Sequence, residues 1–166
     1  MEIPEIKDKE LHRIVTATLI YKANKDKQFT YLLIKRALHK KVQPGKWAYP
    51  GGGLNVDDYI HIQSYSETIL RWPRSLEISL RREVSEEVGL EVEKPEFFMD
   101  VTFINPDGTP VICFCYFAPY VSGEVILDED STDFAWVNLE EAKKYDLVEG
   151  IWDEIRQVDE ILKSRK

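Results

Sequence analysis

The chain has 166 residues, of which 43% are hydrophobic, and its 22 Lys and Arg against 30 Asp and Glu give a formal net charge of −8. This length and hydrophobic content suffice for a buried core, and with no repeat or low-complexity tract we expect a single domain over residues 1–166. The acidic balance makes a broad nucleic-acid-binding surface unexpected. We find neither a basic-then-apolar leader nor a membrane-length apolar stretch, so we expect a cytoplasmic protein without a membrane partner.

Strands and turns are predicted for the first third of the chain. Residues 13–22 and 29–36 are rich in β-branched and aromatic side chains, and the polar residues 23–27 between them indicate a hairpin turn. The following segment, 45–53, ends in three consecutive glycines. Such a turn allows close backbone approach and leaves carbonyl groups free to face a ligand.

Residues 54–73 follow the glycines and combine acids, aromatic residues and several Ile. This mixture is too apolar for a solvated linker, so we expect the segment to pack against the protein. Two interpretations stay open: a lid or specificity loop beside an active site, or an excursion that packs on the surface. Pro73 suits the first turn of a helix that follows.

A helix is predicted over residues 74–88, and its apolar stripe is formed by Leu76, Leu80, Val84 and Val88. Beside the stripe, at the edge of the core, lie three acids: Glu83, Glu86 and Glu87. Like charges raise one another's proton affinity unless a cation compensates them, and carboxylates suit Mg²⁺ or Mn²⁺. The alternative is a solvated acidic face, because glutamate is a strong helix former. Gly89 is expected to end the helix.

Strands and helices alternate in the second half of the chain. Strands are predicted near 95–104, 110–121 and 133–137, with a strong turn signal at 105–110. Asn138 is expected to cap one helix, and a last amphipathic helix follows Gly150 to about residue 163. Together these elements predict an α/β fold with a mixed sheet between helical layers. Cys113 and Cys115 are expected to be buried, reduced thiols on one face of a strand.

The segment Arg82-Glu83-Val84-Ser85-Glu86-Glu87-Val88-Gly89-Leu90, with Pro50-Gly51-Gly52 ahead of it, resembles the signature of the Nudix hydrolases. That signature runs G-x5-E-x7-R-E-U-x-E-E-x-G-U, where U is aliphatic, and its second half matches at every specified position. The resemblance implies an α/β/α sandwich with a mixed β-sheet. It also implies a metal-dependent hydrolase that cleaves the pyrophosphate linkage of a nucleoside diphosphate joined to another moiety.

The first half of the signature departs from the family pattern. Arg74 stands where the family has Glu, and Thr68 stands where it has Gly, so residues 54–73 look like an insertion within the motif. In the family, the missing Glu pairs with the Arg of the R-E dipeptide and braces the glycine loop against the helix. Arg82 is therefore expected to be a structural brace, with Glu67 or Glu77 as its replacement partner.

The resemblance also implies roles for individual residues. A site for Mg²⁺ or Mn²⁺ would be built from Glu83, Glu86, Glu87 and a backbone carbonyl of Gly51 or Gly52. Glu83 would bind metal or orient the attacking water. Family members often recruit a later acid as a base or ligand, and within the acidic residues 128–130 we select Glu129 as a second catalytic candidate.

The substrate is expected to be a small-molecule nucleotide, and a homodimer stays open. Trp47 and Tyr49 could stack on a base, with core packing as the alternative, and Arg36 could reach a phosphate from the end of a strand. Nudix members of the ADP-ribose type tend to carry a proline sixteen residues after the motif, and Pro106 stands there. The resemblance therefore slightly favours a nucleotide sugar such as ADP-ribose over a nucleoside triphosphate. Two other classes of protein stay open: a non-catalytic Nudix-like nucleotide-binding or regulatory module, and a carboxylate-rich structural domain that binds no metal.

Overall fold

The computed structural model describes residues 11–25, 28–66 and 68–165. Its strands are β1 (Arg13–Ala23), β2 (Phe29–Arg36), β3 (Trp47–Ala48), β4 (Gly51–Gly53), β5 (Glu91–Val92), β6 (Glu96–Ile104), β7 (Pro110–Ser122) and β8 (Ser131–Val137). Its helices are the 3-10 helix η1 (Val56–Asp58) and the α-helices α1 (Ser75–Val88), α2 (Leu139–Ala142) and α3 (Ile151–Ser164).

The strands form one mixed sheet, which in the described residues has eight strands. Its central order is β3-β2-β1-β7-β5, while β4 pairs with β1, β6 with β7 and β8 with β2. β1 and β7 run parallel from Arg13↔Val111 to Tyr21↔Pro119, and in the described residues every other pair of named strands is antiparallel. The predicted mixed sheet is therefore confirmed.

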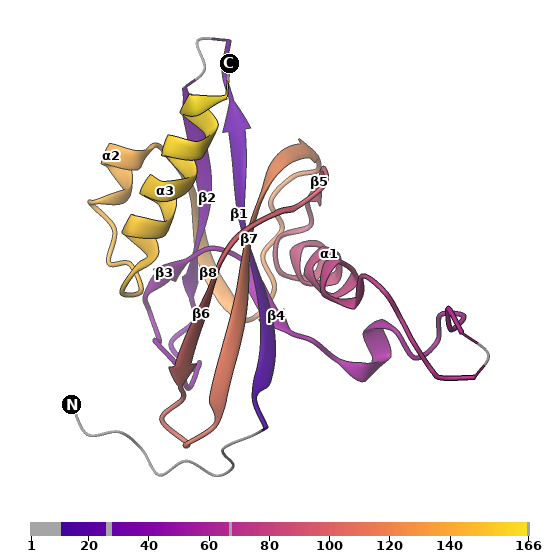
Figure 1. Ribbon diagram of the computed structural model, residues 1–166. Coiled ribbons are helices and arrows are strands. Elements are labelled where there is room, and N and C mark those ends of the chain that lie inside the picture. Colours follow the sequence, from indigo (N-terminus) through magenta and orange to yellow (C-terminus); the bar gives the residue numbers. More distant parts are fainter. Residues whose placement is uncertain (1–10, 26–27, 67, 166) are drawn as a thin grey trace.

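Helices cover both faces of the sheet, with α1 on one side and α2 and α3 on the other (Figure 1). Successive residues of a strand point to opposite faces, so Leu19 and Leu33 pack with α3, while Ile20 and Leu32 pack with α1. All four are fully buried, and each contributes about 1.5–3 kcal/mol of transfer free energy. The predicted α/β/α sandwich is confirmed.

Strand and helix bounds differ from prediction by two residues or fewer, but β3, β4 and β5 were not predicted, because two or three residues are too few to show a period. Asn138 caps α2 as expected, accepting a hydrogen bond from the Glu141 N–H at 2.9 Å. Cys113 and Cys115 are buried free thiols, which confirms that prediction. In the described residues, no helix has the length and apolar character to cross a membrane.

Candidate functional site

The helix α1 carries the three predicted acids at the edge of a buried stripe. Leu80, Val84 and Val88 on this stripe are at most 1% exposed. The helix ends at Gly89, which has a left-handed backbone (φ 65°) and donates its N–H to the Ser85 carbonyl at 3.1 Å. Gly89 is thus the helix stop that the sequence predicts, and it fixes where the acidic turn of the helix lies.

The glycine strand β4 lies directly against this acidic turn. The backbone N–H of Gly51 donates to Oε2 of Glu87 at 2.8 Å. A Cβ atom on Gly52 would lie 2.2 Å from the Glu83 carboxylate, and one on Gly51 would lie 2.5 Å from the Thr16 carbonyl oxygen. Only glycine at these two positions lets the strand approach both the helix and β1 so closely.

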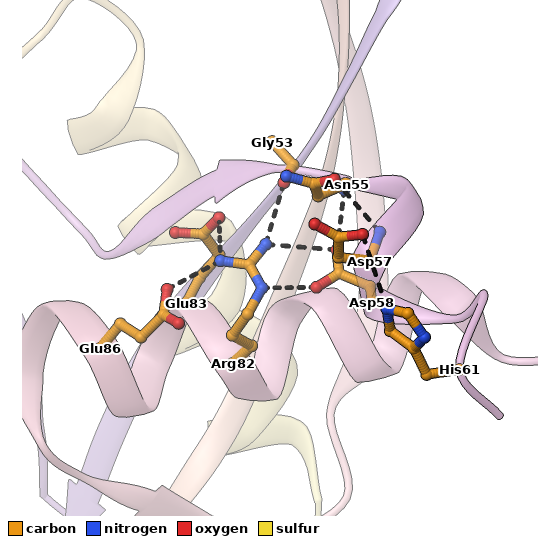
Figure 2. Close-up of polar contacts among 8 residues, drawn as sticks. All are labelled: Gly53, Asn55, Asp57, Asp58, His61, Arg82, Glu83 and Glu86. Carbon is orange, nitrogen blue, oxygen red and sulfur yellow. Dashed lines mark hydrogen bonds and ion pairs between the residues drawn. The ribbon is translucent and has the colours of Figure 1, made fainter.

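Arg82 joins three parts of the site through one guanidinium group (Figure 2). Its Nε and Nη2 both donate to the carboxylate of Asp58, with Nη2 at 3.2 Å from Oδ2, and Nη2 also reaches the Gly53 carbonyl at 3.1 Å. Its Nη1 lies 2.9 Å from Glu83 and 2.8 Å from Glu86. The hydrogen bonds from Arg82 lower the pKa of Asp58, which is the partner of a strong, charge-assisted pair.

Arg82 pairs with Asp58, and not with Glu77, one of the two expected partners. Glu77 pairs instead with Arg74 at 2.6 Å and with Arg81 at 3.1 Å, and Glu67 lies outside the described residues. Asp58 belongs to η1 in the segment 54–73, where its Oδ2 accepts the N–H of Asn55 at 2.8 Å in a reciprocal capping arrangement. The sequence signal that could have found it is this Asn-x-x-Asp cap.

Glu87 and Glu83 form a partly buried acidic pair. Burial raises the pKa of Glu87 to about 7, and the carboxylates of Glu83 and Asp128 add to this rise, while the Gly51 N–H and Lys40 oppose it. Burial also raises the pKa of Glu83, against the effect of Arg82. In the described residues no Lys or Arg forms an ion pair with Glu87, so this part of the site favours a bound cation or a proton.

The loop before β8 brings Asp128, and not Glu129, beside Glu87. This loop joins the end of α1 through Ile126 N–H to the Val88 carbonyl at 3.1 Å and Asp128 N–H to the Glu87 carbonyl at 3.4 Å. Burial raises the pKa of Asp128, whereas Glu129 is exposed at the tip of a turn. The acidic loop lies against the end of α1, and the acid whose charge acts on Glu87 is Asp128, the first of its three acids.

The predicted metal ligands lie on adjacent turns of α1 but bond to different partners. No group of three or more His, Cys, Asp or Glu in the described residues is arranged to hold a metal ion. Glu86, whose side chain is 59% exposed, bonds to Arg82, while Glu87 accepts the Gly51 N–H. Cation binding by all three acids therefore requires the exposed Glu86 side chain to turn away from Arg82.

The predicted substrate contacts are separated by the structure. Trp47 and Tyr49 are 9% and 7% exposed, so neither ring offers a face for base stacking, and that expectation is corrected. Trp47 packs edge-on against Tyr145, and the Tyr49 hydroxyl donates to Glu154 at 2.6 Å. Arg36 is half-buried and lines a recess beside Glu87, and Tyr49 contributes to the wall of the same recess.

The recess beside Glu87 has a cationic side formed by Arg36 and Lys40. Nε of Arg36 donates to the Val42 carbonyl at 3.0 Å, which holds the guanidinium in place. Nζ of Lys40 bonds to Asp130, whose carboxylate also contacts His39 at 3.0 Å. Lys40 was not selected from the sequence, where it is one of several lysines in a polar loop.

The remainder of the segment 54–73 extends beyond α1, away from the sheet (Figure 1). It closes on itself, since the rings of Tyr59 and Trp72 lie 5.2 Å apart and Trp72 Nε1 donates to the Ile62 carbonyl at 2.8 Å. Several of its apolar side chains are exposed, among them Tyr65 at 79% and Leu70 at 72%. Among the described residues of this segment, Asp58 is the one whose side chain bonds to Arg82.

Comparisons with known proteins agree with this geometry. The NUDIX domain family model matches residues 12–158. Nucleoside triphosphatase NudI of Klebsiella pneumoniae (strain 342) is 31% identical over 123 residues, covering 70% of this chain and 79% of that protein. NudI of Escherichia fergusonii is 32% identical over 127 residues, with the same two coverages.

Solved structures share the fold. The MutT protein from Methanosarcina mazei Go1 superposes with a TM-score of 0.69 at 23% identity, covering 96% of this chain and 100% of that chain. The NUDIX domain of Shewanella oneidensis NrtR, solved with ADP ribose, gives a TM-score of 0.65 at 22% identity, covering 92% and 90%. At these identities the likeness concerns the fold alone.

The close approach of β4 to α1 yields a first prediction. Gly52→Ala forces a methyl group against the Glu83 carboxylate and should cost about 1–3 kcal/mol of unfolding free energy, measured by urea denaturation. Gly53→Ala is the matched control, because its Cβ would meet the exposed Arg13 side chain at 2.8 Å, which can move into solvent, whereas the Glu83 carboxylate is largely buried and bonded to Arg82. Equal stability of the two variants would contradict the close approach.

The raised pKa of Glu87 yields a second prediction. Its folded value of about 7 lies above the reference value of 4.5, so the stability that Glu87 contributes is present below about pH 4.5 and is lost as pH rises through 7. In EDTA, the free energy of unfolding of the wild type should fall between pH 5 and pH 8. Glu87→Gln should reduce that fall by up to about 3 kcal/mol. Urea denaturation across this range measures it, with Glu91→Gln, an exposed glutamate, as the control. A wild-type pH dependence in Glu87→Gln would refute the assignment.

Proposed function

The chain belongs to the Nudix family, and we propose that this pyrophosphohydrolase acts on nucleoside triphosphates with a divalent cation, releasing a nucleoside monophosphate. In this reaction a water oxygen bonds to phosphorus, and the P–O bond of the bridge between the α- and β-phosphates breaks with its electron pair going to the leaving group. The water proton passes to a base, and the products are a nucleoside monophosphate and pyrophosphate. Such cleavage needs positive charge on the phosphate oxygens and a carboxylate aligned with the water.

The observation that carries the proposal is the partly buried acidic cluster on α1. Glu87 and Glu83 lie against the glycine strand with raised pKa values, and Asp128 adds a third carboxylate nearby. Buried carboxylates are costly unless protons or cations compensate them. Carboxylate and carbonyl oxygens are the ligands that hard cations such as Mg²⁺ and Mn²⁺ prefer, so the donor set fits the expected metal.

Each residue then has a role in this chemistry. Glu86 and Glu87, with Glu83 and a backbone carbonyl of Gly51 or Gly52, would hold the cation. When bound, the cation supplies charge neutralisation at the phosphate oxygens. Glu83 orients the water, and Asp128 replaces Glu129 as the candidate for a second base, because it is the loop acid whose charge acts on Glu87.

A nucleoside triphosphate is favoured over a nucleotide sugar by two observations. The relatives at 31% and 32% identity are named nucleoside triphosphatases. Arg36 and Lys40 line the recess beside Glu87, where cations can contact the additional charged phosphate of a triphosphate. Pro106, which gave the slight preference for ADP-ribose, lies in the β6–β7 turn, where proline is favoured because its ring fixes the backbone angle φ.

The ADP ribose in the NrtR domain keeps nucleotide sugars as the second candidate. That domain shares the fold of this chain at 22% identity. A substrate panel distinguishes the two classes directly.

Turnover should depend on both metal and Glu86. We expect monophosphate release from nucleoside triphosphates with Mg²⁺ or Mn²⁺, none with EDTA, and a loss of at least about 100-fold in kcat/KM for Glu86→Gln. The assay covers nucleoside triphosphates, nucleotide sugars and dinucleoside polyphosphates, with Glu91→Gln as the control. Metal binding without turnover of any compound would instead indicate a nucleotide-binding module, and no metal binding would indicate a structural domain.

Lys40 should contribute to triphosphate binding. Lys40→Met should raise KM for a nucleoside triphosphate about 10-fold, with a smaller effect on kcat, since a ground-state contact to phosphate is lost. Lys41→Met is the matched control, because Lys41 is exposed and lies outside the recess. Steady-state kinetics of the two variants measure the difference, and equal KM values would remove Lys40 from the site.

A further inference from the structure

Asp58 bonds to the guanidinium of Arg82 from the side opposite Glu83 and Glu86 (Figure 2). We propose that Asp58 is a positioning residue that keeps Glu83 and Glu86 available to the divalent cation by neutralising Arg82. The inference rests on the proposed metal-dependent function. Asp58 bonds directly to Arg82 and is not placed in contact with substrate or metal.

The position of Asp58 is fixed by its surroundings. Its side chain is 1% exposed, against 30% for Arg82. Both of its oxygens accept hydrogen bonds from Arg82, and Oδ2 also accepts the Asn55 N–H at 2.8 Å. A buried carboxylate bonded at both oxygens has one orientation, so the cap of η1 determines where the guanidinium lies.

The donors of Arg82 are divided unevenly between its partners. Nε and Nη2 are directed to Asp58 and the Gly53 carbonyl, which leaves Nη1 as the nitrogen that contacts the two glutamates of α1. Glu83 at 2.9 Å and Glu86 at 2.8 Å therefore share one nitrogen of a cation that already has an anionic partner. They are oriented by Arg82, but they are not needed to balance its charge.

Loss of Asp58 changes this balance. Arg82 keeps its positive charge at all relevant pH values, and Glu83 and Glu86 become its nearest anions. These are acids that the cation also requires, so Arg82 then competes with the metal for them. Asp58 thus affects metal affinity through charge, which a purely structural brace would not do.

Asp57 provides a matched control for the test. It precedes Asp58 in η1, carries the same charge, is 79% exposed, and lies 3.8 Å from His61. We expect Asp58→Asn to raise the Mn²⁺ dissociation constant of the substrate-free protein about 10- to 100-fold. Asp57→Asn should leave the Mn²⁺ dissociation constant within about twofold of the wild-type value, because the charge of an exposed side chain is screened by solvent. Calorimetric titration measures both constants, and urea denaturation measures stability separately.

The double variant D58N/R82Q decides the mechanism. It removes both charges, so it leaves no unpaired guanidinium to compete with the metal and no buried unpaired charge to prevent folding. We expect its Mn²⁺ affinity to return to within a few-fold of the wild-type value, although kcat stays reduced because the glycine strand is no longer braced.

Each outcome bears on one idea. If Asp58→Asn binds Mn²⁺ as tightly as Asp57→Asn does, the proposed role of Asp58 is overturned, whatever the stability of Asp58→Asn. A double variant that binds Mn²⁺ about 10-fold or more weakly than wild type would do the same, including where Asp58→Asn alone does not fold. A wild-type protein that neither binds Mn²⁺ nor hydrolyses any nucleotide would overturn the proposed function itself.

Discussion

The close contact between the glycine strand β4 and the helix α1 is the constraint on which the site depends. Without side chains at Gly51 and Gly52, the strand backbone reaches Glu87 directly and lies against the Glu83 carboxylate. The contact also partly excludes water from these acids, which raises their pKa values. The packing of β4 against α1 therefore sets both the backbone geometry of the site and the proton affinity of its acids.

Charge balance around α1 follows from that contact. On the outer side, Arg82 is neutralised by Asp58 and bonds to Glu83 and Glu86. On the inner side, Glu87 has a backbone donor and neighbouring carboxylates, and in the described residues it has no paired Lys or Arg. The helix thus has a side on which charges are balanced and a side, at Glu87, that favours a cation. The recess lined by Arg36, Lys40 and Asp130 adjoins the Glu87 side.

The sequence predicted the layered fold well because its periodic segments are long. Residues 29–36 are rich in β-branched and aromatic side chains, the stripe of α1 recurs at helical spacing, and the glycine stop at Gly89 is a local signal. The partners of the site residues were harder to predict, because Asp58, Asp128 and Lys40 reach the site only through tertiary contacts. Trp47 and Tyr49 show the same limit, since an aromatic residue beside a glycine turn can face either the core or the solvent.

Asp58 lies 24 residues from Arg82 in the chain but bonds to it directly. Residues between the two elements leave the body of the protein and return, so their number is not fixed by the distance that the ion pair spans. Each doubling of such a loop costs only about 0.6 kcal/mol of closure entropy. The exposed part of the segment near Tyr65 is therefore a site at which a foreign peptide can be inserted while the ion pair between Asp58 and Arg82 is kept.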